Sequence, residues 1–232
     1  MKFQLLYFSG TGNTALITEE ISQALNNPPH QVSSLKLENV LENPELLQNC
    51  DVLGIGFPVY KFSYPDIFKK LFPLLEEWRK THSEHQLKQL PVFVFSTYCR
   101  FNSASLKMMS SDLSKIGFDV IMTESFKCPS NGIASLQPVN SFDYTSVMYF
   151  EAGIKTKIKE FADAISAKAE HYQAPPLNGS THRENKLQQF KISFVEKVEK
   201  ARYPFLSIDK NKCIGCGLCA KNCPEKNLEM NM

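Results

Sequence analysis

The chain has 232 residues, enough for one α/β domain of ordinary size and a small second module. Of these residues 43% are hydrophobic and 22% are charged, as in soluble globular proteins, and the formal net charge is only +2. A net charge this close to zero argues against nucleic acid or an anionic membrane as a partner. The first apolar run, residues 3–8, is too short for a membrane span or a signal-peptide core, so we expect a cytoplasmic protein.

Apolar runs alternate with amphipathic segments along residues 1–172. Short runs that are apolar on both faces predict buried strands, and apolar residues spaced by three or four predict helices. The expected strands are residues 3–8, 32–37 (weaker and near an edge), 51–57, 91–96 and 119–126. The expected helices are residues 13–25, 66–80 (kinked or restarted at Pro73), 106–116 and 144–171. The alternation favours an α/β fold, a doubly wound parallel sheet with helices on both faces.

A polar loop joins the first expected strand to the first expected helix: Ser9, Gly10, Thr11, Gly12, Asn13 and Thr14. In a parallel sheet this is the carboxyl edge, where ligands bind. The glycines let the backbone turn tightly, the hydroxyls add donors, and the helix presents the positive end of its dipole. The Lys of the nucleoside-triphosphate loop is missing. The loop therefore predicts a phosphate cradle without a cation, and a polar turn that only caps the helix is the alternative.

The Ser-Gly-Thr-Gly-Asn-Thr loop resembles the FMN-phosphate loop of flavodoxins, and the resemblance extends over residues 1–172. It implies a flavodoxin-like five-stranded sheet with FMN as cofactor. In flavodoxins two further loops at the same edge hold the flavin ring. By this resemblance the ring contacts are Tyr60 and Tyr98, supported by Pro58, Val59, Thr97, Cys99 and Arg100. In the alternative interpretation each tyrosine packs on its own surface loop.

Four cysteines near the C-terminus have the C-x2-C-x2-C-x3-C-P spacing of bacterial ferredoxins: Cys213, Cys216, Cys219 and Cys223. This spacing predicts a [4Fe–4S] cluster. Gly215 and Gly217 let the chain curl around a cluster, which Ile214 and Leu218 would shield from water. Zinc sites instead pair two Cys-x-x-Cys knuckles across a longer loop, so zinc or free thiols are the less favoured alternatives.

In two-cluster ferredoxins the fourth cysteine of one run binds the cluster of a second run, and no second run follows Cys223 in this sequence. If residues 219–223 form a helical turn, Cys223 points away from the other three thiols. We therefore expect a shortened ferredoxin module with three thiolates, an incomplete or absent cluster and an orphan Cys223. In the competing interpretation all four thiols bind one centre.

A flavodoxin-like domain joined to a bacterial-type ferredoxin module resembles the EFR1 family of ferrodoxins. The expected parts are an FMN-binding domain (1–172), a linker with a connecting helix (173–203) and a partial ferredoxin-like iron–sulfur module (204–232). The resemblance implies an electron-transfer protein that relays low-potential electrons between FMN and the cluster, with ferredoxin or a reductase as redox partner. No catalytic constellation is evident, and the alternatives are an FMN-dependent reductase of quinones, nitro compounds or NAD(P)H with the cluster as its internal wire, or a redox sensor.

Overall fold

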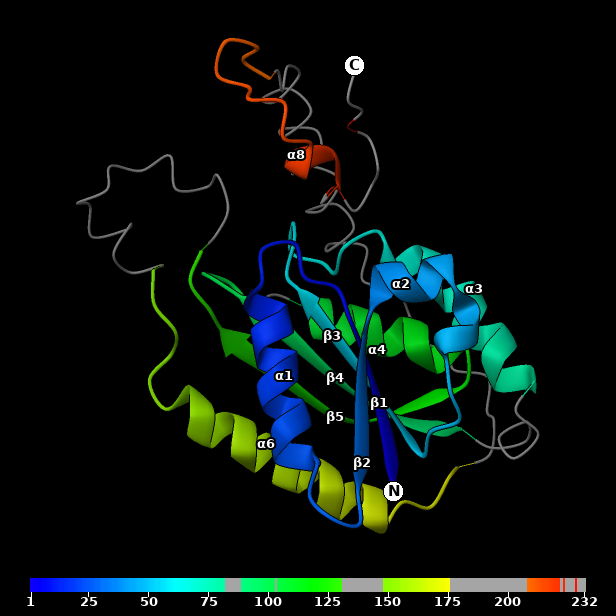
Figure 1. Cartoon of the computed structure of the whole chain (residues 1–232). Helices are drawn as coiled ribbons and strands as arrows, with labels where there is room; N and C mark the ends of the chain where they lie inside the picture. The colour runs from blue at the N-terminus through cyan, green and yellow to red at the C-terminus, as the bar shows by residue number, and fades with distance from the viewer. Residues whose placement is uncertain are drawn as a thin grey trace. The chain divides into compact units, whose positions relative to one another are not determined.

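The structure is a computed structural model that describes residues 1–81, 89–102, 104–130, 148–175 and 208–221, together with Cys223 and Leu228 (Figure 1). The chain forms two compact units, Met1–Asn185 and Lys186–Met232. The first unit holds the sheet and its helices, and the second holds the cysteine run. None of the helices in the described ranges is long and apolar enough to cross a membrane.

Five parallel strands form the sheet, as the alternation of elements predicts. Their order across the sheet is β2 (Gln31–Lys36), β1 (Lys2–Tyr7), β3 (Val52–Pro58), β4 (Leu90–Tyr98) and β5 (Phe118–Lys127). The three central strands are buried on both faces, whereas β2 is at an edge and has no fully buried residue. The carboxyl ends of β1, β3 and β4 are therefore neighbours at one edge of the sheet.

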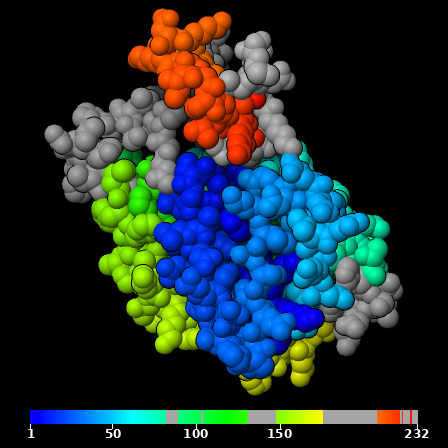
Figure 2. Space-filling model, viewed as in Figure 1, coloured from blue at the N-terminus to red at the C-terminus, as the bar shows by residue number. Residues whose placement is uncertain are grey.

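Helices cover both faces of the sheet (Figure 1). Side chains of α1 (Asn13–Leu25) and α6 (Ile154–Glu170) share one apolar cluster with strand residues such as Leu5 and Phe93. These two helices also lie side by side on the surface (Figure 2). The opposite cluster joins strand residues such as Leu6 to α2 (Leu37–Glu42), α3 (Phe68–Thr81) and α4 (Ser105–Lys115). A 3-10 turn, Pro44–Leu46, follows α2.

Two glycines of β3 make room for aromatic rings from the neighbouring strand. A Cβ at Gly54 would approach the Phe93 ring, and a Cβ at Gly56 would lie closer than 3.0 Å to three ring atoms of Phe95. Both phenylalanines are fully buried, so their rings have little room to withdraw. The two glycines thus allow the phenylalanine rings of β4 to pack directly against the backbone of β3.

The structure decides three points about the expected helices. The helix expected over residues 144–171 begins at Ile154, because Gly153 has a left-handed φ of 71° immediately before it and residues 148–153 are not helical. The helix that contains Pro73 is continuous from Phe68 to Thr81, so no new helix starts at the proline. The short helix α2 was not expected, since its six residues carry too little periodicity to be distinguished from the end of β2.

Candidate functional site

Direct hydrogen bonds connect the three loops that the sequence assigns to the site. The backbone N–H of Val59, after β3, donates to the Thr97 carbonyl of β4 at 2.8 Å. The N–H of Phe8, which leads into the polar loop, donates to the Gly56 carbonyl of β3 at 3.1 Å. Because β3 lies between β1 and β4, these bonds hold the three loops at one place on the carboxyl edge.

The polar loop turns at Gly12, which has a φ of 102° and is the N-cap of α1. Such a φ is readily available to glycine and unfavourable for other residues. The Ser9 Oγ accepts the backbone N–H groups of Gly12 at 3.1 Å and Ala15 at 3.2 Å. Since both donors point at the hydroxyl oxygen, the proton of the Ser9 hydroxyl remains available for a further acceptor.

Several amides at the start of α1 have no acceptor. Among the described residues, the backbone N–H groups of Gly10, Asn13 and Thr14 make no hydrogen bond, and the N-cap residue, Gly12, has no side chain that could bond to them. The first turn carries no acidic residue that would repel an anion. The Asn13 side chain donates to the Pro129 carbonyl at 2.7 Å, which connects the loop to the segment after β5. The loop is therefore a set of aligned donors without a bound acceptor, which suits a phosphate group.

The hydroxyl of Thr14 is buried and pairs with a second hydroxyl. Thr14 is 1% exposed and its Oγ1 lies 2.8 Å from Oγ1 of Thr97, which is 4% exposed. This buried pair connects the polar loop directly to the end of β4. Two hydroxyls that bond each other use only one of their two protons, so one proton remains for a further acceptor.

The second loop folds back on itself in a tight turn from Tyr60 to Ser63. The two residues exchange backbone hydrogen bonds of 2.9 and 2.8 Å, and the central residues Lys61 and Phe62 have φ angles of 51° and 64°. Such positive φ values at both central residues are those of a type I′ turn. Pro58 and Val59 are half-buried and lead the chain from β3 into this turn.

Tyr60 lies against the polar loop. Its ring packs edge-on to Phe8, with centroids 6.3 Å apart, and a Cβ built on Gly10 would lie 2.6 Å from the tyrosine hydroxyl. The side chain is 43% exposed, and its partial burial raises the pKa of the phenol above the ordinary value. The Tyr60 hydroxyl thus lies beside the polar loop, and the ring contact expected of this residue stays a prediction.

The third loop follows β4. Tyr98 and Cys99 are half-buried, and Arg100 is exposed. The Tyr98 carbonyl accepts the Cys128 N–H at 2.8 Å, while burial and then the nearby Glu151 carboxylate raise the pKa of its phenol. The loop thus presents one tyrosine, one thiol and one cation near the sheet edge.

Two exposed aromatic side chains that the sequence did not single out lie in the second and third loops. Phe62 in the second loop is 39% exposed and Phe101 in the third is 65% exposed. Their ring centroids lie 6.2 Å apart with an interplanar angle of 38°. Both residues belong to loops of the expected site, and an aromatic residue in a loop directly after a buried strand was the available sequence signal.

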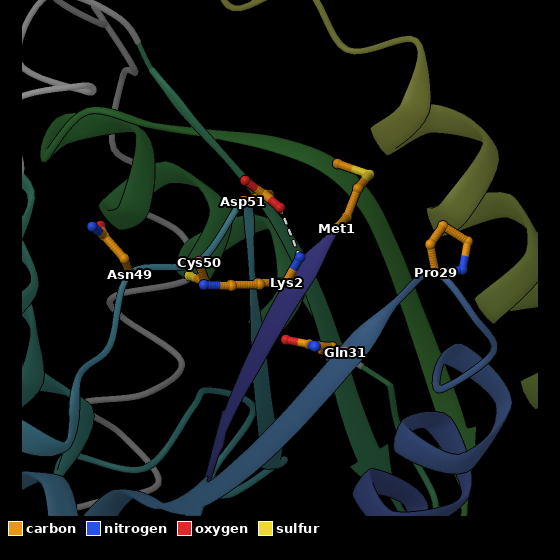
Figure 3. A pocket seen from close by; sticks show the side chains of 7 residues that line it. All are labelled: Met1, Lys2, Pro29, Gln31, Asn49, Cys50 and Asp51. Atoms are coloured by element: carbon orange, nitrogen blue, oxygen red, sulfur yellow. Dashed lines mark hydrogen bonds between the residues drawn. The ribbon is translucent and has the colours of Figure 1, made fainter.

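A hollow of about 470 Å³ lies at the opposite edge of the sheet (Figure 3). It is bounded by residues at the amino ends of β1, β2 and β3, namely Met1, Lys2, Pro29, Gln31, Asn49, Cys50 and Asp51. The Lys2 N–H donates to the Asp51 carboxylate there at 2.7 Å. None of the residues assigned to the site from the sequence lines this hollow.

In the second unit the cysteine run is open. Cys213, Cys216 and Cys219 are exposed, and no three Cys, His, Asp or Glu side chains of the described chain are grouped as metal ligands. Gly215 and Gly217 have φ angles of 69° and 70°, which confirms that glycines provide the turns of this segment. Ile214 and Leu218 are 88% and 59% exposed, and the shielding of a bound cluster expected of them stays a prediction.

Cys223 is half-buried and lies beyond the short helix α8 (Leu218–Lys221). The helical turn expected over residues 219–223 therefore ends before Cys223, so helical geometry does not fix the direction of this thiol. Whether three or four thiols share a centre stays a prediction. The expected connecting helix, residues 184–202, lies outside the described residues.

Comparison with solved structures defines the first unit as a flavodoxin-like fold. A flavodoxin from the domain Archaea has 14% sequence identity, with a TM-score of 0.50 over 74% of this chain and 100% of that one. A short-chain flavodoxin associated with a non-canonical PDU bacterial microcompartment has 12% identity and a TM-score of 0.51, over 73% of this chain and 99% of that one. Residues 205–228 match the family described as a 4Fe-4S binding domain. No curated protein matches the chain significantly.

Proposed function

We propose that this protein transfers electrons with an FMN held at the carboxyl edge of the sheet and a [4Fe–4S] cluster held by the cysteine run. The observation that carries the proposal is the polar loop, in which the N–H groups of Gly10, Asn13 and Thr14 have no acceptor within the described residues. A flavodoxin-like fold with such a loop, followed by a segment that matches a 4Fe-4S binding domain, suits two redox cofactors.

The FMN phosphate would receive hydrogen bonds from these amides and from the hydroxyls of Ser9 and Thr11. Because the loop contains no cation, the phosphate keeps its negative charge near the ring. A negative charge there opposes the addition of further charge to the flavin, which favours a low reduction potential. FMN, when bound, can accept and release one or two electrons.

The flavin ring would lie beside the second and third loops. Tyr98 and the exposed pair Phe62 and Phe101 offer aromatic surface there. The remaining lining residues we assign to this end are Pro58, Val59, Thr97, Cys99 and Arg100.

The cluster would be held by the thiolates of Cys213, Cys216, Cys219 and Cys223. The donor set suits iron, because four thiols at this spacing are the ligands of bacterial ferredoxin clusters. The left-handed Gly215 and Gly217 let the intervening chain reverse direction between ligands. The exposed thiols would have to converge on the metal, so we expect binding of the cluster to order this segment.

The arrangement favours residues 1–172 as the flavin domain, 173–203 as a linker and 204–232 as the iron–sulfur module, as in the EFR1-type ferrodoxins that the sequence resembles. A protein of this kind would exchange electrons with a ferredoxin or a reductase in the cytoplasm. The cluster passes single electrons while the flavin can hold two, so the protein could connect one-electron and two-electron partners.

The visible spectrum of the full chain tests this function. We expect resolved flavin bands and a broad iron–sulfur shoulder after anaerobic purification and reconstitution with FMN, iron and sulfide. The combined change of Cys213, Cys216 and Cys219 to Ser should remove the shoulder and leave the flavin bands, whereas the matched control Cys50→Ala, a buried thiol of the first unit, should keep both. A protein that stays colourless after reconstitution would refute the proposal.

A further inference from the structure

The geometry points to the Tyr60 hydroxyl as a hydrogen-bond donor to the phosphate end of the flavin, so that Tyr60 distinguishes FMN from riboflavin and does not serve as a face for the flavin ring. This inference rests on the proposed function, because it presumes that FMN binds at the polar loop.

The position of the hydroxyl is the first reason. It lies so close to Gly10 that a Cβ at that residue would be 2.6 Å from the phenol oxygen, while the next ring atom, Cζ, would be 3.8 Å away. The hydroxyl therefore lies beside the loop whose amides lack acceptors. Ring contacts alone would not place the polar tip of the side chain at the phosphate loop.

The second reason is that the backbone holds this orientation. Tyr60 is the first residue of the tight turn, and its N–H and carbonyl both bond to Ser63. Its ring also packs edge-on against Phe8, the residue just before the polar loop. With backbone and ring both held, the side chain loses little further rotational freedom when its hydroxyl meets a ligand.

The third reason is the chemical state of the hydroxyl. Among the described residues it has no hydrogen-bond partner, so its proton is free to be donated. Partial burial raises the pKa of the phenol, and the group therefore remains a neutral donor at physiological pH. A donor of this kind strengthens a cradle that contains no cation.

The ring surface then comes from other residues. Phe62, at the tip of the same turn, and Phe101, from the third loop, form an exposed aromatic pair. In the second loop, Tyr60 would therefore bind the phosphate end of the flavin, and Phe62 would contact its ring.

Titration of the flavin-free full chain with FMN and with riboflavin tests the role of Tyr60. We expect Tyr60→Phe to weaken FMN binding about tenfold to hundredfold, as for the loss of one hydrogen bond to a charged group, and to leave riboflavin binding unchanged. Tyr60→Leu, which also removes the ring, should give the same FMN loss and the same riboflavin affinity. The matched control is Tyr149→Phe, which removes the hydroxyl of another half-exposed tyrosine and should change neither affinity.

Three results would overturn the inference: unchanged FMN affinity in Tyr60→Phe, equal losses for FMN and riboflavin, or tighter FMN binding, which would mean that the phenol blocks the loop. Failure of the proposed function would look different, because the unaltered protein would then bind neither flavin.

A second variant checks the placement of the hydroxyl independently. Gly10→Ala should push the phenol away from the loop, since only the hydroxyl is closer than van der Waals contact to the new methyl group. We therefore expect the effects of Gly10→Ala and Tyr60→Phe on FMN affinity to be non-additive. The double variant should bind FMN as well as the single variant with the lower affinity, or better. Additive losses would show that the hydroxyl is not the group that the methyl displaces. Equal thermal unfolding temperatures of the variants would establish that each is folded.

Discussion

The buried hydroxyl pair of Thr14 and Thr97 can be removed one partner at a time. Valine has nearly the shape of threonine, so Thr14→Val removes the hydroxyl and leaves the packing. The remaining Thr97 hydroxyl is then buried without its partner, 2.8 Å away in the unaltered protein. Leaving a buried hydroxyl unsatisfied destabilises a protein by about 1–3 kcal/mol, and we expect the same from Thr97→Val.

The double variant should be close to the unaltered protein in stability, because no hydroxyl is left unpaired. The coupling energy between the two sites is therefore expected to equal the sum of the two single effects, about 2–6 kcal/mol. For a protein of this size each kcal/mol lowers the unfolding temperature by about 2–4 °C, so each single variant should melt about 2–12 °C lower.

Thermal unfolding of the four proteins, with urea unfolding as a second measurement, determines the coupling. Thr123→Val on β5 is the control, because Thr123 is exposed and its change should have almost no effect. Single effects that add in the double variant would refute the reasoning, since they would mean that the hydroxyls do not satisfy each other. Flavin titration adds a functional measure: if Thr14 contacted the phosphate independently, Thr14→Val alone would weaken FMN and leave riboflavin unaffected.

Two further predictions concern the core and the thiols. Gly56→Ala should destabilise the first unit by about 2–3 kcal/mol in urea unfolding because its methyl group would overlap the buried Phe95 ring, and an unchanged midpoint would contradict the close approach of the two strands. In cluster-free protein at pH 8, iodoacetamide should label the exposed Cys213, Cys216 and Cys219 and should spare Cys50 and Cys128, since burial raises the pKa of both to about 12. Labelling of Cys50 or Cys128 in folded protein would contradict this prediction. Because the folded state keeps these two protons, the free energy of unfolding should also fall as the pH rises from 9 toward 12.

The sequence alone determined those features whose chemistry is contained in a few consecutive residues. Both faces of residues 3–8 and 91–96 are apolar, which is enough to predict buried parallel strands and, from their alternation with helices, the class of fold. The cysteine spacing is equally local, because the reach of a short backbone segment around a cluster depends mainly on the residues between the ligands. The polar loop was found for the same reason, since the two glycines and the helix start directly follow a strand.

The tertiary structure alone decided which side chains of these loops meet. Thr14 and Thr97 are 83 residues apart and pair because β3 brings the ends of β1 and β4 to one edge. The orientation of Tyr60 depends in the same way on the turn to Ser63 and on the space left by Gly10. A residue pattern records which face of an element is apolar, but the partner of a side chain in a loop depends on strand order and backbone turns far along the chain. These long-range contacts place the Tyr60 hydroxyl beside the polar loop and join that loop to the end of β4.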